Sequence, residues 1–486
     1  MAQESLKEKT IKGTGWSAVD NIANQGITFL TGLVLARLLT PEEYGLIAII
    51  SIFINVFNSF VDSGLSNALI RKNNANDTDY NTVFWSNLFI SLLLSIILFF
   101  GAIPIAYFFS RPQLEPLTQV MSVILIINAF AIIQRTILIK KIDFKTQTKV
   151  SLIASITSGF VGVATAFIGL GVWALVLQQI TRQFLNSLFL WFFSKWRPMW
   201  KFSKSSFNDF FGFGWKLLVS SIIGTIWNEL YQVVIGKFYT PATLGQYTRA
   251  SQFGSIFSSN ITGVVMRVSY PVLSGIKEDK ERLREAYRRV IKATMLVTMC
   301  CMIGLAGCAG SFVYVLVGRQ WMDCVPMLQI LCFNLMLYPL HSINLNMLQV
   351  QGRSDIFLKL EIIKRIIGIG PLLLGVFVGI YWMLISSVFV GFFSLYLNAR
   401  FSGPYLNYDV LNQARDIMPS FFVALVTGLI VYFIGLIKLN PFILLPLQVL
   451  VGAICVILIC ELMRLNEYNE IKEICVNTFI KLKHLI

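Results

Sequence analysis

The sequence predicts an all-α, polytopic membrane protein of about 14 transmembrane helices. The composition is 56% hydrophobic and only 13% charged, and the mean hydropathy is +0.70. Long uncharged runs recur along the chain, and its two halves resemble each other. A spanning helix needs about 20 largely apolar residues, so about 14 helices account for most of the apolar content. Little sequence remains for a water-soluble domain.

Uncharged runs mark the membrane crossings. The stretches between Lys149 and Arg182 and between Arg365 and Arg400 are too long for one helix across a core of about 30 Å. Each predicts a helical hairpin, with glycine-containing turns at residues 169–173 and 379–382. The predicted helices are 14–38, 43–68, 82–109, 116–138, 148–169, 172–194, 213–237, 243–270, 290–317, 324–349, 358–379, 381–400, 417–437 and 441–462.

The positive charges predict the orientation. If the amino terminus is cytoplasmic, the even-numbered loops and both tails hold about 30 of the 40 Lys and Arg residues, and the odd-numbered loops about five. The positive-inside rule therefore predicts that both termini are cytoplasmic. The net charge of +15 then reflects topology, and nucleic acid is not an expected partner.

The chain contains an internal duplication. Residues 37–45 (RLLTPEEYG) align with residues 237–245 (KFYTPATLG), and Gly15-Trp16 aligns with Gly214-Trp215. Six crossings separate the copies, which predicts parallel repeats about an axis along the membrane normal and a cavity between them. The predicted regions are an amino-terminal six-helix lobe (1–200), a second six-helix lobe (201–402), and two extra helices with an interfacial tail (403–486).

Ionisable groups inside predicted spans are costly, so they normally face a bundle interior or an aqueous cavity. Here they concentrate in the first two helices of each repeat. Polar residues at helical spacing form four stripes: Asp20, Asn24, Thr28 and Thr31; Asn55, Asn58 and Asp62; Thr225, Glu229 and Gln232; and Arg249, Gln252, Ser255 and Ser259. The stripes line a water-filled route for a polar, anionic headgroup, or they hydrogen-bond neighbouring helices.

The predicted cavity has a cationic set and an acidic set. Arg37 and Lys237 end the first helix of each repeat on the predicted outer side, where they either meet a diphosphate or stabilise a helix terminus. Pro41 and Pro241 begin the next helices, and Gly45 and Gly245 allow close packing. The substrate-binding candidates are Arg249, Arg37, Lys237, Lys216, Arg182, Arg267, Asn24, Asn58 and Gln252. The ion-coupling candidates are Asp62, Glu229 and Asp20. No metal site, cofactor or catalytic residue is predicted.

Several short motifs resemble those of a known family. They are Lys12 to Trp16, the turn Ala36-Arg37-Leu38-Leu39-Thr40-Pro41-x-x-Tyr44-Gly45, Asp62-x-Gly64-Leu65 and Ile142-Asp143-Phe144. Together they resemble the bacterial polysaccharide (oligosaccharide repeat-unit) flippases of the lipopolysaccharide and colanic-acid exporter type. That family belongs to the multidrug/oligosaccharidyl-lipid/polysaccharide exporter superfamily.

The resemblance implies a V-shaped transporter that moves an undecaprenyl-diphosphate-linked oligosaccharide across the bacterial inner membrane by alternating access, for surface polysaccharide synthesis. It also implies membrane lipids, a polysaccharide polymerase and a chain-length regulator as partners. Two alternatives stay open: a multidrug cation antiporter of the same superfamily, and a membrane polysaccharide polymerase or glycosyltransferase. An antiporter would favour an acidic cavity, and an enzyme would ordinarily show a large outer loop or a carboxylate-rich loop.

Overall fold

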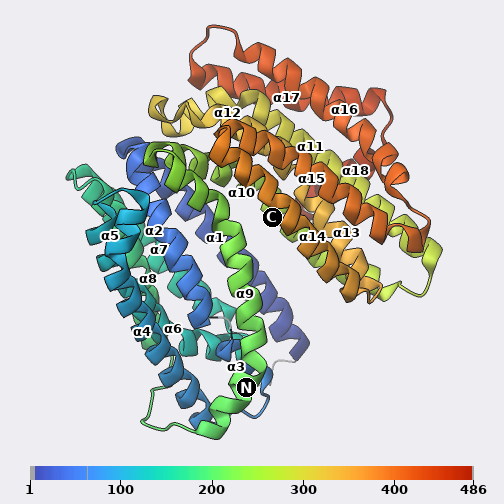
Figure 1. The fold of residues 1–486 in the computed structure, drawn as a ribbon. Coiled ribbons are helices and arrows are strands. Elements are labelled where there is room, and N and C mark those ends of the chain that lie inside the picture. The colour runs from blue at the N-terminus through green and yellow to red at the C-terminus, as the bar shows by residue number, and fades with distance from the viewer. Residues whose placement is uncertain (1–5, 63, 484–486) are drawn as a thin grey trace. The chain divides into compact units, whose positions relative to one another are not determined.

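The chain is all α-helical (Figure 1). The computed structural model describes residues 6–62 and 64–483, and within these ranges it contains eighteen α-helices, two short 3-10 helices and no β-strand. Among the described residues, ten helical segments are long and apolar enough to span a membrane. The predicted fold class, an all-α polytopic membrane protein, is confirmed.

The chain divides into two compact units, residues 1–245 and 246–486. The helices of the first unit are α1 (Leu6–Leu38), α2 (Pro41–Asp62), α3 (Leu65–Arg71), α4 (Asp77–Phe109), α5 (Leu114–Met121), α6 (Val123–Lys140), α7 (Phe144–Phe167), α8 (Val172–Phe193) and α9 (Lys204–Phe238). Helix α10 (Pro241–Gly275) begins in the first unit and continues into the second.

Helix α2 is the central element of the first unit. It packs against α4, α6, α8 and α9, while α1 packs on α7 and α7 on α8. Helices α3, α4, α6 and α9 meet around a buried apolar cluster that includes Leu69, Phe84, Ile133 and Phe210. Since α9 packs against α2, α3 and α4, the second predicted repeat begins inside the first compact unit. The lobe boundaries 1–200, 201–402 and 403–486 therefore stay a prediction from the duplication.

Helix α11 is the central element of the second unit. The remaining elements are α11 (Lys280–Val317), a 3-10 turn (Arg319–Trp321), α12 (Cys324–Leu335), α13 (Tyr338–Val350), α14 (Ser354–Phe377), α15 (Ile380–Ser402), a 3-10 turn (Pro404–Leu406), α16 (Val410–Gly435), α17 (Pro441–Leu462) and α18 (Asn466–Lys483). Helix α11 packs against α12, α13, α16, α17 and α18.

A buried hydrogen-bond network joins four helices of the second unit. The Tyr287 hydroxyl donates to Asn344 Oδ1 at 2.5 Å, and the same oxygen accepts from Ser402 Oγ at 2.8 Å and from Gln413 Nε2 at 3.1 Å. These residues belong to α11, α13, α15 and α16. The first of the two predicted extra helices, α16, is therefore built into the core of this unit.

Each of the fourteen predicted helices has a helical counterpart in the structure, and both predicted hairpin turns lie where expected. Gly169 and Gly171 adopt φ of +87° and +55° between α7 and α8, and Gly379 adopts φ of +146° between α14 and α15. These left-handed conformations explain the glycines at the turns.

Three predicted helices are interrupted, contrary to the prediction. The segment 43–68 divides into α2 and α3, 116–138 into α5 and α6, and 324–349 into α12 and α13. Pro339, in the first turn of α13, has no backbone N–H to continue the helix from α12. Ser122, between α5 and α6, donates its hydroxyl to the Gln119 carbonyl at 2.7 Å, a bond that competes with the helical ladder.

Candidate functional site

A polar groove lies in the first unit between α2 and α9. Its volume is about 400 Å³, and its lining side chains are amides, hydroxyls and one carboxyl group. They are Asn55, Asn58, Ser59, Ser221, Thr225, Asn228 and Glu229. Both helices are candidate membrane spans, so the groove places hydrogen-bonding groups at membrane depth.

Glu229 is the most buried polar group of the groove, at 9% exposure. Its Oε1 accepts from Asn55 Nδ2 at 3.0 Å, and its Oε2 accepts from Gln232 Nε2 at 2.6 Å. Two amide donors offset the cost of burying the carboxyl group. Among the described residues that line the groove, Glu229 alone is ionisable.

The other groove residues also bond between helices. Ser59 Oγ lies 2.8 Å from Thr225 Oγ1, which connects α2 to α9, and Asn128 Nδ2 of α6 donates to Asn58 Oδ1 at 3.0 Å. The same side chains therefore join helices and line an open groove. The interhelical hydrogen bonds considered for the stripes are present here, and a role of these residues in a substrate route stays a prediction.

The groove contains more polar residues than the sequence stripes predict. Ser59, Ser221 and Asn228 were not among the candidates. A signal for them exists, because Ser59 follows Asn55 by four residues, and Ser221, Thr225 and Asn228 recur at spacings of four and three. Serine is also common at close helix contacts in membranes, so a serine in a predicted span does not by itself indicate a site.

The two predicted outer cations lie at helix ends, as expected. Arg37 is exposed at the end of α1. Lys237, at the end of α9, donates to the Phe108 carbonyl oxygen, and its ammonium group lies 4.6 Å from the centre of the Phe108 ring. Lys237 therefore connects α9 to the carboxyl-terminal end of α4, and its predicted contact with a diphosphate stays a prediction.

The next three cationic candidates lie on different helices. Lys216 is exposed on α9, with its ammonium group 6.0 Å from the Trp215 ring centre. Arg182 is half-buried on α8, and Arg267 is exposed on α10. In the first unit, neither Lys216 nor Arg182 lines the polar groove.

Arg249 is the most buried of the cationic candidates, at 4% exposure. Its Nη1 donates to Gln252 Oε1 at 2.8 Å, which joins two predicted site residues. The guanidinium carbon lies 5.1 Å from the centre of the Trp321 ring. This environment within the second unit fixes the position of the guanidinium group.

Asp20 and Asn24 belong to a network between α1 and α7. Asn24 Nδ2 donates to Asp20 Oδ1 at 2.6 Å and to Ser151 Oγ at 2.8 Å, and Asn24 Oδ1 accepts from Ser155 Oγ at 2.7 Å. These contacts hold the two helices together. The side chain of Asp62, the remaining acidic candidate, lies outside the described residues.

The duplicated turns contact each other. A Cβ atom added to Gly45 would lie 1.8 Å from the Pro241 carbonyl oxygen, and one added to Gly245 would lie 1.9 Å from the Pro41 carbonyl oxygen. Each glycine therefore faces the first residue of the other copy's helix. The reciprocal contact explains why Pro and Gly recur at the same spacing in both copies, and it bears out the close packing expected of Gly45 and Gly245.

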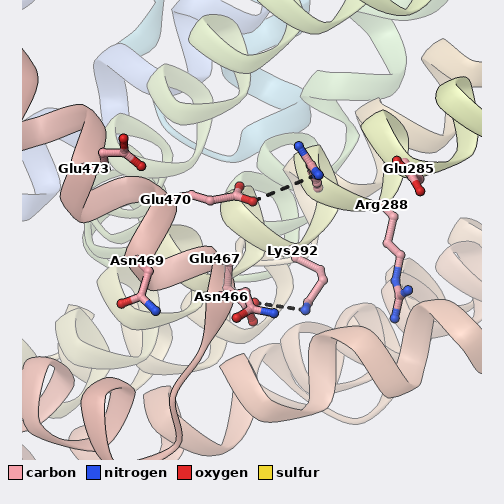
Figure 2. Close-up of a pocket in the computed structure, with 9 residues that line it drawn as sticks. Glu285, Arg288, Lys292, Asn466, Glu467, Asn469, Glu470 and Glu473 are labelled. Carbon is pink, nitrogen blue, oxygen red and sulfur yellow. Dashed lines mark ion pairs between the residues drawn. The ribbon is translucent and has the colours of Figure 1, made fainter.

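A second polar cavity, of about 540 Å³, lies in the second unit between α11 and α18 (Figure 2). Lys292 points toward Glu467, and their Nζ and Oε2 atoms are 2.9 Å apart. Arg288, one turn before Lys292 on α11, binds Asp416 of α16 through Nε and Nη2, at 2.5 and 2.6 Å. These charged pairs were not predicted individually, because the charges of residues 277–292 form a dense run with many alternative pairings.

Comparison with known proteins identifies relatives of the chain. Residues 34–326 match the family described as "Polysaccharide biosynthesis protein". The chain is 26% identical over 331 residues to the succinoglycan biosynthesis transport protein ExoT of Rhizobium meliloti, covering 68% of this chain and 67% of ExoT. It is 24% identical over 377 residues to the lipopolysaccharide biosynthesis protein WzxC of Escherichia coli, covering 76% of each.

A solved structure shares the fold. The lipid II flippase MurJ in an inward closed conformation superposes with a TM-score of 0.75, over 92% of this chain and 98% of MurJ. The sequence identity is 15%, so this similarity concerns the arrangement of the helices.

Proposed function

Because the chain belongs to the polysaccharide biosynthesis protein family, we propose that it is a flippase for a lipid-linked oligosaccharide used in surface polysaccharide synthesis. Like these relatives, it is a multi-pass membrane transporter, and it is not an enzyme. The observation that carries the proposal is the polar groove between α2 and α9. Hydroxyl and amide groups at membrane depth can replace water around sugar hydroxyls while the headgroup crosses.

The substrate that fits the sequence is an undecaprenyl-diphosphate-linked oligosaccharide. Its diphosphate needs cations, and Arg249, Arg37, Lys237, Lys216, Arg182 and Arg267 are the proposed partners. Its sugars need neutral donors and acceptors, a role assigned to Asn24, Asn58 and Gln252. The hydrophobic tail stays in the surrounding lipid.

Transport is proposed to run by alternating access of the two repeats. The carboxyl groups of Glu229, Asp62 and Asp20 are the candidates for ion coupling, because a proton or cation bound there changes the local charge. Glu229 is supported by its burial and by its two amide donors.

The proposed location is the bacterial inner membrane, with both termini in the cytoplasm. The charge asymmetry of the loops supports this orientation. A polysaccharide polymerase and a chain-length regulator are the proposed protein partners, because a flipped repeat unit must be polymerised to a defined length.

A deletion strain tests the function directly. Mass spectrometry of the undecaprenyl-diphosphate pool, combined with its leaflet distribution, should show complete repeat units accumulating on the cytoplasmic face. An unchanged pool contradicts the flippase, and a drug-susceptibility change in the same strain then identifies the rival antiporter.

Two substitutions test the assigned residues. Arg249→Ala and Asp62→Asn should abolish polymer export without lowering the amount of the protein in the membrane. Normal export by both variants would mean that these charges pack helices and do not act in transport.

A further inference from the structure

The segment between α8 and α9, residues 194–203, is held firmly on α4. The Met199 N–H donates to Asn81 Oδ1 at 2.6 Å, and the Met199 carbonyl accepts from Trp85 Nε1 at 2.8 Å. The Ser203 N–H donates to Thr82 Oγ1 at 3.0 Å. Three hydrogen bonds to the start of one helix give this connection a defined path, although it has no regular secondary structure.

The same segment presents large apolar side chains outward. Trp200 is 88% exposed, although one face of its ring stacks on Trp85 with the ring centres 4.1 Å apart. Met199 and Phe202 are exposed beside it. The segment leads from α8 into α9, which is a candidate membrane span, and tryptophan prefers the headgroup layer of a bilayer. An ordered segment that exposes these side chains is therefore suited to that layer.

The charge of the segment is entirely positive. Lys195, Arg197 and Lys201 are exposed within residues 194–203, which contain no acidic residue, and Lys204 follows at the start of α9. The Arg197 guanidinium group is tied back, because Nη1 donates to the Ser194 and Trp196 carbonyl oxygens at 2.6 and 2.8 Å.

The acidic residues on the adjoining part of α4 leave this excess of positive charge in place. Asp79 is fully buried and pairs with Lys72, with 2.8 Å between Nζ and Oδ2. Asp77 is exposed, as is Asp209 near the start of α9, so two exposed carboxylates stand against the four bases of residues 195–204. The net field around the segment therefore attracts anions.

We propose that residues 194–204 form a binding site for the headgroup of an anionic phospholipid. Trp200 sits at headgroup depth, and Lys195, Lys201 and Lys204 attract the lipid phosphate. The site holds α4, α8 and α9 at a fixed level in the membrane. This inference does not depend on the transported substrate.

Brominated lipids test the site with the full chain in nanodiscs. Two discs contain the same mixture of phosphatidylglycerol and phosphatidylcholine, with bromine on the acyl chains of one or the other. The Trp200 contribution is the difference in fluorescence between the chain and its Trp200→Phe variant. The quenching of Trp200 should show phosphatidylglycerol about fivefold enriched near this residue relative to phosphatidylcholine. One cation near an anionic lipid is expected to produce a factor of this size.

A lysine variant provides the second measurement. Lys195→Gln with Lys201→Gln and Lys204→Gln should remove the preference while leaving the contacts of Arg197 intact. Trp382, which is 57% exposed at the start of α15 and lies in a long uncharged run, is the matched control and should be quenched equally by both lipids in every variant. Equal quenching of Trp200 by the two lipids, no quenching by either, or a preference that survives the lysine substitutions would overturn the proposal.

Discussion

At the scale of single residues, Glu229 is the side chain on which the transport account depends most. A buried carboxyl group is retained in a membrane span only where hydrogen bonds or solvent compensate for its burial. Asn55 and Gln232 supply two such bonds, and the groove supplies access. This combination distinguishes Glu229 from Asp20, whose contacts lie between α1 and α7.

Glu229→Gln is expected to reduce polymer export by at least about tenfold, because the amide keeps the size of the side chain but cannot carry or release a charge. Membrane abundance should stay near the level of the unmodified chain. Export is measured as surface polysaccharide in the complemented deletion strain.

Glu115→Gln is the matched control for that substitution. It removes the same charge from the first turn of α5, away from the groove, and should leave export unchanged. If Glu229→Gln exports as well as Glu115→Gln does, Glu229 serves only to join α2 and α9.

The sequence predicted part of the groove and missed part of it. Asn58 and Glu229 were found because amides and charges in spans are conspicuous. Ser221 was missed because serine occurs widely between helices in membranes. Which stripe residues share one groove depends on the contact between α2 and α9, two helices separated by more than a hundred residues, and no local pattern contains that information.

At the scale of helices, hydropathy placed a helix at each of the fourteen predicted positions but did not place the helix starts, and ten segments of the described chain are long and apolar enough to span a membrane. The predicted helix at 213–237 begins at Lys204, and the one at 290–317 begins at Lys280. Ser203 and Asp279 cap these starts by accepting from the backbone N–H groups of Ser206 and Arg282, at 3.2 and 3.1 Å. A hydropathy pattern detects only the part of a helix that is apolar, whereas caps set its true beginning.

The close contact between the two duplicated turns predicts that adding one methyl group at Gly45 or Gly245 lowers the stability of the fold. Gly45→Ala or Gly245→Ala should destabilise the chain by about 1–3 kcal/mol, because the new Cβ atom would overlap a proline carbonyl oxygen. The measurement is the thermal unfolding midpoint of the purified chain in detergent.

Gly101→Ala is the control for these substitutions. Gly101 lies inside α4, and a Cβ atom added there would meet no atom within 4 Å, so the change should be neutral or slightly stabilising. Equal stability of the Gly45→Ala and Gly101→Ala variants would contradict the close contact between the turns.

The carboxyl-terminal helix α18 provides a separate prediction. The Glu467 side chain is 3% exposed and pairs with Lys292, so Lys292→Met leaves a buried carboxylate without its cation. The expected cost is about 1–3 kcal/mol, and Lys292→Met with Glu467→Gln should recover most of it. Limited proteolysis of α18 and thermal unfolding measure the effect.

Lys472→Met is the comparison for the α18 pair. Lys472 pairs with Glu461 at 2.7 Å, but both side chains are about half exposed, so its loss should have little effect on stability. A Lys292→Met variant that is as stable as Lys472→Met would show that apolar packing alone holds α18.

At the scale of the whole molecule, composition and duplication predicted the class of protein. Sparse charges and uncharged runs sufficed for an all-α membrane protein, because both follow from the physics of a bilayer. The repeated turn added the duplication that is typical of transporters. The division into compact units at residue 245 was not foreseen, since it depends on how α9 packs against α2, α3 and α4.

The most direct measurement of the central claim uses the purified chain in liposomes. Lipid-linked glycan isolated from the deletion strain is placed in both leaflets, and periodate, which does not cross the bilayer, oxidises the glycan that it can reach. Liposomes with the chain should expose the protected inner-leaflet glycan over time, and the Glu229→Gln variant should do so much more slowly. If the protected share stays the same with and without the chain, the protein does not flip this lipid.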